Sequence, residues 1–161
     1  MTYTDNDNIL RSYGYTYDEM NRLKGSYYQK EYTETNSYDE HLTYDKNGNI
    51  LTLNRNGFVD GDTPGMTYPI DELNYMYENN NKSNRLVSVA DHTNSIDGFK
   101  DGNLSGVDYD YDDLGNMIRD RNKGIDKIIY NHLNLPIKIV FSNSSEIHYI
   151  YNAVGVKMRK R

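Results

Sequence analysis

A tyrosine-anchored unit recurs six times along this chain of 161 residues. If the second member of each Tyr-x-Tyr-like pair is taken as an anchor, the anchors are Tyr17, Tyr44, Tyr77, Tyr111, Tyr130 and Tyr151. The residue two positions before each anchor is aromatic or aliphatic: Tyr15, Leu42, Tyr75, Tyr109, Ile128 and Tyr149. Alternation with a period of two is typical of a half-buried strand. The pattern therefore predicts a β-strand that ends at each anchor.

The residues that follow each anchor predict a tight turn. The first residue after the anchor is Asp18, Asp45, Glu78, Asp112, Asn131 or Asn152, and the fourth is Asn21, Gly48, Asn81, Gly115, Asn134 or Gly155. Gly and Asn best tolerate a left-handed backbone, and an Asp or Asn side chain accepts a hydrogen bond from the amide two residues further on. Each unit is therefore expected to form a β-hairpin tip.

The resulting fold prediction is all-β, with successive antiparallel hairpins across residues 1–161. The tips are expected near residues 18–21, 45–48, 78–84, 112–115, 131–134 and 152–155, and the third turn is expected to be three residues longer than the others. The returning strands are expected at 22–28, 49–55, 85–89, 116–120, 135–141 and 156–160. With 17 Tyr, 3 Phe and no Trp among only 36% hydrophobic residues, the core is expected to be thin and built largely from tyrosine rings.

The segment around the fourth anchor carries an acidic run. Alternation predicts that Tyr109 and Tyr111 point to one face of their strand, and that Asp108, Asp110 and Asp112 point to the other. Carboxylates on one face repel one another unless a cation or an arginine neutralises them. Arg119 and Arg121 on the returning strand are the favoured partners, and adventitious binding of a cation is the alternative.

Composition argues against several classes of function. The net charge is −6 and the basic residues are dispersed except at the end of the chain, which does not favour nucleic acid or an anionic membrane as a partner. The absence of cysteine excludes disulfides, thiolate catalysis and Cys-ligated zinc. No apolar run approaches transmembrane length, so no membrane insertion is expected, and the first residues lack the features of a signal peptide. Either the protein is cytosolic, or its targeting signal lies elsewhere.

No catalytic or metal-binding motif stands out. The four histidines, His41, His92, His132 and His148, lack metal-ligand spacing. Residues 45–49 have the alternating oxygens of a calcium loop, but Gly falls at the fourth position and Asn56 at the twelfth, where an EF-hand needs Gly at the sixth and Glu at the twelfth. A plain turn is the preferred interpretation. We expect no enzyme activity, no cofactor and no metal.

Several of these segments resemble the YD repeats of the Rhs family, which also includes shell regions of Tc toxins and teneurins. The resemblance rests on "YTYDEMNRL", "LTYDKNGNI", "SNRLVSV", "VDYDYDDLGNM", "IIYNHLNLPIKI" and "IYNAVGVKMRK", and it covers residues 13–160. The passage from "GFKDGN" to "NHLNLPIKI" looks particularly like Rhs proteins of Bacteroidetes.

The resemblance implies a curved sheet that is part of a spiral, hollow β-shell on a secreted or surface-located bacterial protein. Such shells enclose a toxic or otherwise reactive C-terminal domain, so the implied role is a non-catalytic wall segment whose partners are the rest of the parent protein and its cargo. Nothing at the C-terminus matches the self-cleaving segment of family members, so proteolysis is not carried over. The alternative is a surface adhesin that binds glycans through its Tyr-rich face.

The two ends of the repeat array are expected to be open sheet edges. The chain opens on the strand-like "ILRSYGYTYD" and closes on the strand-like "YIYNAVGVKMRKR", and neither carries a polar cap. Terminal repeats without caps leave unpaired backbone groups. The chain is therefore expected to self-associate or to occur within a larger assembly.

Overall fold

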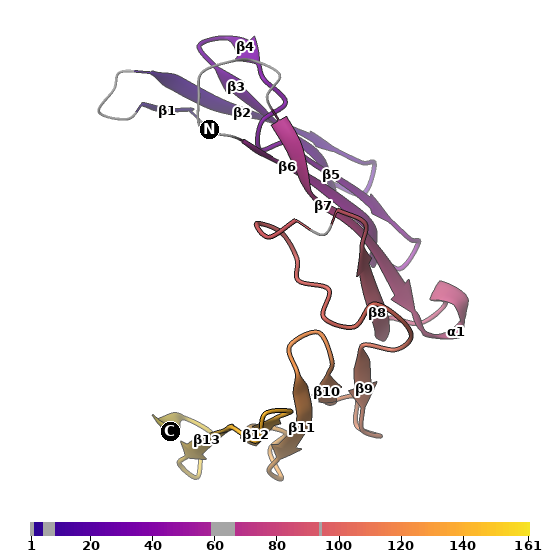
Figure 1. Ribbon diagram of the computed structural model, residues 1–161, viewed down its shortest axis with the longest axis vertical. Coiled ribbons are helices and arrows are strands. Elements are labelled where there is room, and N and C mark those ends of the chain that lie inside the picture. Colours follow the sequence, from indigo (N-terminus) through magenta and orange to yellow (C-terminus); the bar gives the residue numbers. More distant parts are fainter. Residues whose placement is uncertain (1, 5–8, 59–66, 94) are drawn as a thin grey trace. The chain divides into compact units, whose positions relative to one another are not determined.

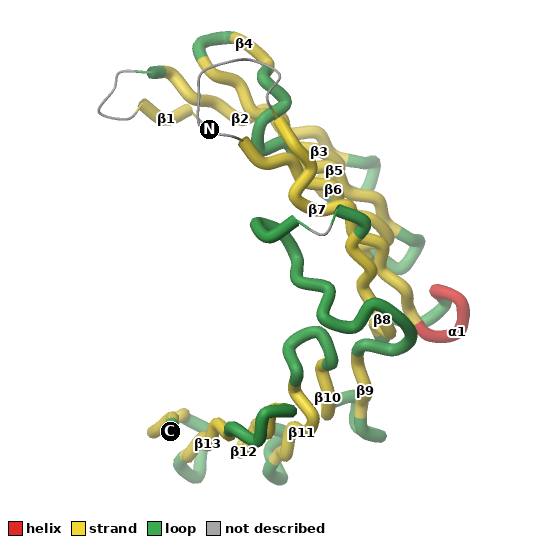
Figure 2. Tube along the Cα trace, in the orientation of Figure 1, coloured by secondary structure: helices red, strands yellow, loops and turns green. Residues whose placement is uncertain are grey.

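Strands make up almost all of the regular structure (Figures 1 and 2). The computed structural model describes residues 2–4, 9–58, 67–93 and 95–161. In these ranges one four-residue helix accompanies the β-strands. The all-β prediction with antiparallel hairpins is confirmed. The stretch that resembles YD repeats, 13–160, also contains residues 59–66 and 94, which lie outside the described residues.

The chain divides into two compact units, and its strands form two sheets. Unit 1 comprises Met1–Met76 and Val89–Lys100, and unit 2 comprises Tyr77–Ser88 and Asp101–Arg161. The antiparallel hairpins are thus divided between two sheets, where the resemblance implies a single curved sheet. Each unit is described by itself below.

The first sheet is antiparallel, with the order β1-β2-β3-β5-β6-β7-β8 and with β4 on one end of β3. Its strands are β1 (Thr2–Thr4), β2 (Leu10–Tyr17), β3 (Leu23–Lys30), β4 (Thr33–Glu34), β5 (Glu40–Tyr44), β6 (Ile50–Phe58), β7 (Thr67–Tyr77) and β8 (Leu86–Asp91). Thr2 pairs with Ser12, so β1 covers the side of β2 that faces away from β3. The prediction that β2 is an open edge is wrong for residues 10–12, which β1 covers. Among the described residues, no strand pairs with the outer side of residues 13–17.

The second sheet has the order β14-β13-β12-β11-β10-β9, so each strand lies beside its neighbour in sequence. Its strands are β9 (Tyr109–Tyr111), β10 (Met117–Asp120), β11 (Ile125–Tyr130), β12 (Pro136–Phe141), β13 (Glu146–Tyr151) and β14 (Lys157–Lys160). Two turns not predicted as hairpin tips, at Gly124 and Ser144, complete this meander with φ angles of 60° and 66°.

The six predicted returning strands correspond to β3, β6, β8, β10, β12 and β14, with each boundary within three residues of the prediction. The third turn departs from the other five. It contains the short helix α1 (Glu78–Asn81), in which Asn79, Asn80 and Asn81 all have positive φ. Asn tolerates this conformation better than other residues that carry a Cβ. The longer turn is thus accommodated by three consecutive residues with a left-handed backbone.

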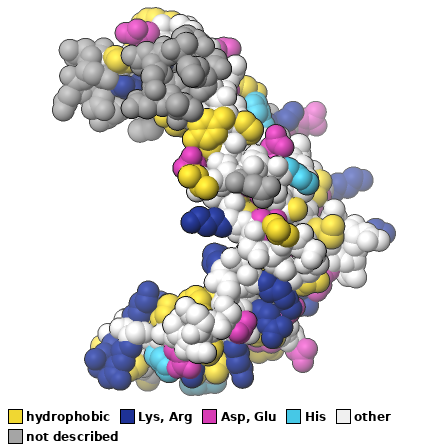
Figure 3. All heavy atoms as spheres, in the orientation of Figure 1, with side chains coloured by type: hydrophobic (Ala, Val, Ile, Leu, Met, Phe, Trp, Pro, Cys, Tyr) yellow, Lys and Arg dark blue, Asp and Glu magenta, His cyan; other side chains and the backbone are white. Residues whose placement is uncertain are grey.

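The apolar core is thin, as the composition predicts. Where the structure describes burial, the buried hydrophobic residues are Tyr28, Leu73, Tyr77, Val89 and Tyr109, and three of these five are tyrosines. Hydrophobic side chains on the face shown in Figure 3 are interspersed with polar and charged ones. By contrast, the largest fully buried side chains are Asp71, Asp108, Asp120 and Ser37. Buried carboxylates were not predicted from the sequence. Their hydrogen bonds and ion pairs are among the polar contacts that hold each unit together.

Candidate functional site: the hairpin turns and the buried carboxylates

Five of the six anchored turns share one hydrogen-bonding pattern. In the turn at Asp112, the side-chain oxygen Oδ1 accepts the amides of Leu114 and Asn116, at 3.0 and 2.8 Å. The Asp112 amide donates to the Asn116 carbonyl at 2.9 Å, and the Gly115 amide donates to the Asp112 carbonyl at 3.0 Å. The same side-chain and backbone bonds occur in the turns that begin at Asp18, Asp45, Asn131 and Asn152. The amide four residues on is an additional donor that the sequence argument did not include.

The fourth residue of each turn is left-handed. The φ angles are 60° at Asn21, 92° at Gly48, 62° at Asn81, 87° at Gly115, 56° at Asn134 and 83° at Gly155. No atom lies within 4 Å of the position that a Cβ would take at Gly48 or Gly115. At these two positions the backbone conformation, rather than a lack of space, favours glycine.

The turn carboxylates titrate below their ordinary range. The Asn116 side chain is the main cause of a lowered pKa at Asp112, and the amides of Asn116, Leu114 and Gly115 act in the same direction. At Asp18 the backbone amide of Arg22 is the largest cause, and it also lowers the pKa. Burial opposes both shifts but is outweighed. The ionised form is thus the one that the turns bind.

The Asp45 turn balances its contributions differently. Burial is the largest single influence on the Asp45 pKa and raises it. Bonds from the side chain and amide of Asn49, with those from the Asn47 and Gly48 amides, together outweigh burial and lower the pKa. Donors within residues 45–49 thus occupy this carboxylate.

The third turn closes by other contacts. The Glu78 amide donates to the Arg85 carbonyl at 3.0 Å, and the Tyr77 amide donates to Asn81 Oδ1 at 2.7 Å. The Glu78 carboxylate lies 3.5 Å from Arg85 Nη1. Glu78 therefore does not take the accepting role that its position after the anchor predicted. In this turn the accepting side chain is that of Asn81, and the donor is the Tyr77 amide.

Anchor tyrosines link one hairpin to the next, and we call Tyr44, Tyr130 and Tyr151 the tyrosine ladder. Their hydroxyls donate to the carbonyls of Leu23, Met117 and Pro136, at 2.7, 2.6 and 2.9 Å respectively. Each accepting carbonyl lies six residues after the preceding anchor in sequence. Because this offset of six residues is constant, the three hydroxyls make equivalent contacts, one in unit 1 and two in unit 2.

Neighbouring turns also touch through the residue five positions after an anchor. Arg22 Nη1 donates to the Asp45 carbonyl at 2.8 Å, and its guanidinium carbon lies 4.7 Å from the centre of the Tyr44 ring. In unit 2, Asn116 Nδ2 donates to Asn134 Oδ1 at 3.2 Å. The turns thus form lateral contacts in addition to the strand ladder.

The acidic run at Asp108, Asp110 and Asp112 does not act as one cluster. Asp110 pairs with Arg119 and Arg121 at 3.2 and 2.9 Å, which is the predicted neutralisation. Asp112 is occupied within its turn. Asp108 is only 1% exposed, and its Oδ1 accepts the side-chain amide of Asn103 at 2.9 Å. The prediction of three carboxylates facing the same arginines is wrong, because two of them have separate partners.

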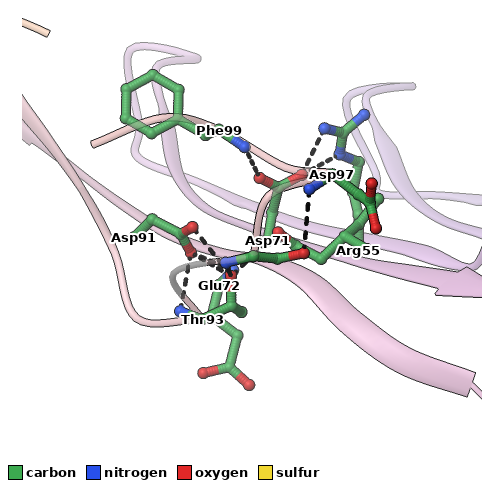
Figure 4. Close-up of polar contacts among 9 residues, drawn as sticks. Arg55, Asp71, Glu72, Asp91, Thr93, Asp97 and Phe99 are labelled. Carbon is green, nitrogen blue, oxygen red and sulfur yellow. Dashed lines mark hydrogen bonds and ion pairs between the residues drawn. The ribbon is translucent and has the colours of Figure 1, made fainter. Parts of the chain in front are cut away.

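Two carboxylates in unit 1 hold the segment after β8 against β7 (Figure 4). Asp71 on β7 is 0% exposed and accepts the Phe99 amide at 2.5 Å and the guanidinium of Arg55. A Cβ built on Gly98 would lie 1.8 Å from the Ile70 carbonyl oxygen, so the segment approaches β7 too closely for any other residue there. The segment 95–100 is therefore fixed by a hydrogen bond from the Phe99 amide to a buried carboxylate and by close backbone contact at Gly98.

Asp91 provides the second contact. Its carboxylate accepts the amides of Glu72 and Thr93, at 3.0 and 3.1 Å, and the Thr93 hydroxyl. Burial is the largest influence on the Asp91 pKa and raises it, but the donors from Glu72 and Thr93, with nearby His92, lower the pKa overall. Sequence reasoning missed both carboxylates, since neither lies at a fixed offset in the tyrosine-anchored unit.

Three of the four histidines have ordinary structural contacts. His92 Nε2 lies 2.7 Å from Asn74 Nδ2, His148 Nε2 lies 2.8 Å from Glu146, and the His41 ring packs edge-on against Tyr27 at 5.4 Å between centroids. Within the described residues, no group of three or more His, Asp or Glu side chains is placed to hold a metal ion. None of the helical structure in those same ranges is long and apolar enough to cross a membrane.

In comparisons with known proteins, no family model and no curated protein matched this chain.

Proposed function

We propose that this chain is a non-catalytic wall segment of an Rhs-type encapsulating protein, secreted or displayed at a bacterial surface, that encloses a C-terminal toxin or effector domain. The tyrosine ladder is the observation that carries the proposal. The hairpin of Tyr130 donates from its anchor hydroxyl to the previous hairpin and, six residues later, presents the Pro136 carbonyl to Tyr151 of the next. Tyr44 makes the same backward donation in unit 1. Such contacts extend a sheet by repetition, which is how a wall of indefinite length is built.

The burial pattern supports a wall rather than a closed globule. In β13, half-buried Ile147, Tyr149 and Tyr151 alternate with exposed Glu146, His148 and Ile150. A sheet with one half-buried and one polar face separates two environments without a deep core. The turns close on their own side chains and amides, and these contacts support a structural role.

Protection of a cargo domain tests the proposal. We would express the chain together with the coding sequence that surrounds it and follow limited proteolysis of the C-terminal domain. If the chain is a wall segment, the C-terminal domain should resist cleavage in the assembled protein and be cleaved when it is produced alone. Gly115→Val, which strains a turn, is expected to weaken protection, whereas Gly14→Val, at an open position within β2, is its control.

Two results would contradict the wall. One is equal cleavage of the cargo in the assembled and isolated forms. The other is saturable glycan binding by this chain on an array together with an unprotected C-terminal domain, which would favour the adhesin alternative.

A further inference from the structure

A row of side chains crosses one face of unit 1. The residues directly opposite one another on successive strands are Tyr15 on β2, Ser26 on β3, Glu40 on β5, Arg55 on β6 and Asp71 on β7. Directly paired residues project from the same face of a sheet. A groove of about 350 Å³ lies along this row, and Tyr13 and Tyr38 also line it. Ser26 is 4% exposed and is the smallest side chain in the row, so it marks the floor.

The charges in the groove do not cancel. Arg55 is directly opposite Glu40, yet its Nε and Nη2 both bind Asp71 on the far side. Because Asp71 is fully buried, its carboxylate needs that guanidinium as its counter-charge. Among the described residues, the Glu40 carboxylate has no hydrogen-bond or ion-pair partner, whereas its backbone is paired within the sheet. The groove therefore keeps one unmatched negative charge at its side.

Aromatic rings also line the groove. The rings of Tyr13 and Tyr15 stack with centroids 6.1 Å apart, Tyr28 packs 5.4 Å from Tyr13, and Tyr38 stands edge-on to Tyr28 at 5.3 Å. Tyr15 is 46% exposed and Tyr38 is 45% exposed, so ring surface remains open to a ligand.

The titration of Tyr13 agrees with this placement. Its pKa is raised, first by burial and then by the proximity of Tyr28, Tyr15, Glu40 and Tyr38. The phenol oxygens and the Glu40 carboxylate thus lie close enough together to act on one another. Of these groups only Glu40 is charged at neutral pH, so Glu40 supplies the negative charge beside the rings.

We propose that this groove binds an alkylammonium group, such as a lysine side chain of another polypeptide segment. Ring faces attract a cation within about 6 Å of their centroids, and an unmatched carboxylate adds a charge-assisted contact. Ser26 lies between Tyr15 and Glu40 in the row and lines the groove, so its small side chain is the one we expect the aliphatic stem of the ligand to lie beside. The inference goes beyond the wall proposal and does not depend on it, because all the residues belong to unit 1.

The test is an NMR titration of the isotope-labelled chain with Nα-acetyl-lysine methylamide. Its control ligand is the norleucine analogue, which has a similar stem and no charge. We expect saturable shifts around Tyr15 and Glu40 with the lysine compound and none with the norleucine compound. Glu40→Gln is expected to weaken binding by about fivefold or more, since the carboxylate supplies the unmatched charge. Glu72→Gln makes the same charge change on an exposed residue next to Asp71 and is expected to leave affinity unchanged.

Tyr15→Leu provides a second variant that keeps the proposal testable if Glu40→Gln fails to fold, and it is expected to weaken binding about threefold through loss of a ring face. Equal binding of both amino-acid ligands would show an apolar site and overturn the proposal. So would the absence of saturable shifts in the wild-type chain, or equal weakening by Glu40→Gln and Glu72→Gln. Binding of a neutral monosaccharide that is insensitive to Glu40→Gln, without lysine binding, would assign the groove to sugars instead.

Discussion

At the scale of single residues, the turns require an oxygen at the first position rather than a charge. Asp112 accepts the amides two and four residues on, and Asn131 accepts its two amides at 2.9 and 3.0 Å through the amide oxygen. The carboxylate and the carboxamide have the same shape but different titration. One chain thus carries titratable and non-titratable versions of the same turn.

The stability of the Asp112 turn is expected to depend on pH. Its folded-state pKa is lowered below the ordinary value of 3.8, mainly by the Asn116 side chain. A lowered pKa contributes stability that is complete above the ordinary value and is lost as the pH falls through the folded-state value. Asp112→Asn keeps an accepting oxygen without the carboxylate. On acidification below about pH 4, the wild type is therefore expected to lose more unfolding free energy than Asp112→Asn does. Denaturant titration of both proteins at several pH values measures this.

Asn131→Asp is the converse experiment, because it should introduce a sensitivity to acid that the native turn lacks. Wild type and Asp112→Asn curves that stay parallel from neutral to acidic pH would show that the folded turn does not prefer the ionised carboxylate.

Gly115→Val is expected to destabilise the fold. Gly115 has a φ of 87°, a conformation that a β-branched residue strongly disfavours, so the loss is expected to be about 1–2 kcal/mol or more. Gly14→Val is the matched control, since Gly14 lies in β2 without positive φ and no atom lies within 4 Å of its built Cβ. Denaturant titration of both variants measures the difference. Equal stability of the two would remove strain at the turn as the explanation.

At the scale of elements, the sequence predicts where strands and turns lie, because their signals are local. Tyr130 and Asn134, for example, mark the end of β11 and the left-handed residue of its turn. The partners of Asp71 could not be predicted, since Phe99 lies 28 residues away and donates through its backbone. An aspartate in an alternating strand is normally assigned to solvent. Its burial here depends on a later segment of chain that has no period of its own.

The tyrosine ladder could be predicted in part, unlike the partners of Asp71 and less fully than the strands and turns. Its constant offset of six residues from the preceding anchor is present in the sequence, but identifying the acceptor required knowing which carbonyl faces the next hairpin. The Tyr44, Tyr130 and Tyr151 contacts supply that register.

Tyr130→Phe is expected to weaken the link between β11 and β10. It removes a hydroxyl that donates to the Met117 carbonyl at 2.6 Å in a partly buried position, for which a loss of about 1 kcal/mol is expected. Tyr17→Phe is the control. The Tyr17 side chain is 58% exposed and makes no hydrogen bond to another described residue, so this variant should be nearly neutral. Thermal and denaturant unfolding measure the stability of the two variants. Equal losses of stability would show that the ladder hydrogen bond does not stabilise the fold.

At the scale of the whole molecule, the main consequence of the fold is the sheet edge at β14. In the described chain, β14 pairs with β13 alone. Such an edge presents unpaired amides and carbonyls to any further strand. The wall proposal requires this edge to accept a neighbour. The positive charges of β14 oppose pairing between two identical edges, so ionic strength should modulate any self-association.

The backbone register of β14 identifies a residue that tests the edge without breaking the hairpin. His148 and Arg161 exchange both backbone hydrogen bonds, at 3.1 and 3.0 Å. Because hydrogen-bonded and non-hydrogen-bonded pairs alternate along antiparallel strands, the next pair, Tyr149 with Lys160, is non-hydrogen-bonded, and the Lys160 amide points away from β13. Proline at 160 therefore removes an outward donor, whereas proline at 159 removes an inward one.

We expect the wild-type chain to self-associate at micromolar concentration in sedimentation velocity experiments, and more so at high salt. Lys160→Pro should shift the distribution towards monomer while circular dichroism retains the strand signal. Arg159→Pro should instead weaken the β13–β14 hairpin itself, because it removes the amide that faces Ile150. A wild-type chain that remains monodisperse and monomeric at low and high salt would mean that this edge does not recruit a strand, and equal association of wild type and Lys160→Pro would place the contact elsewhere on the molecule.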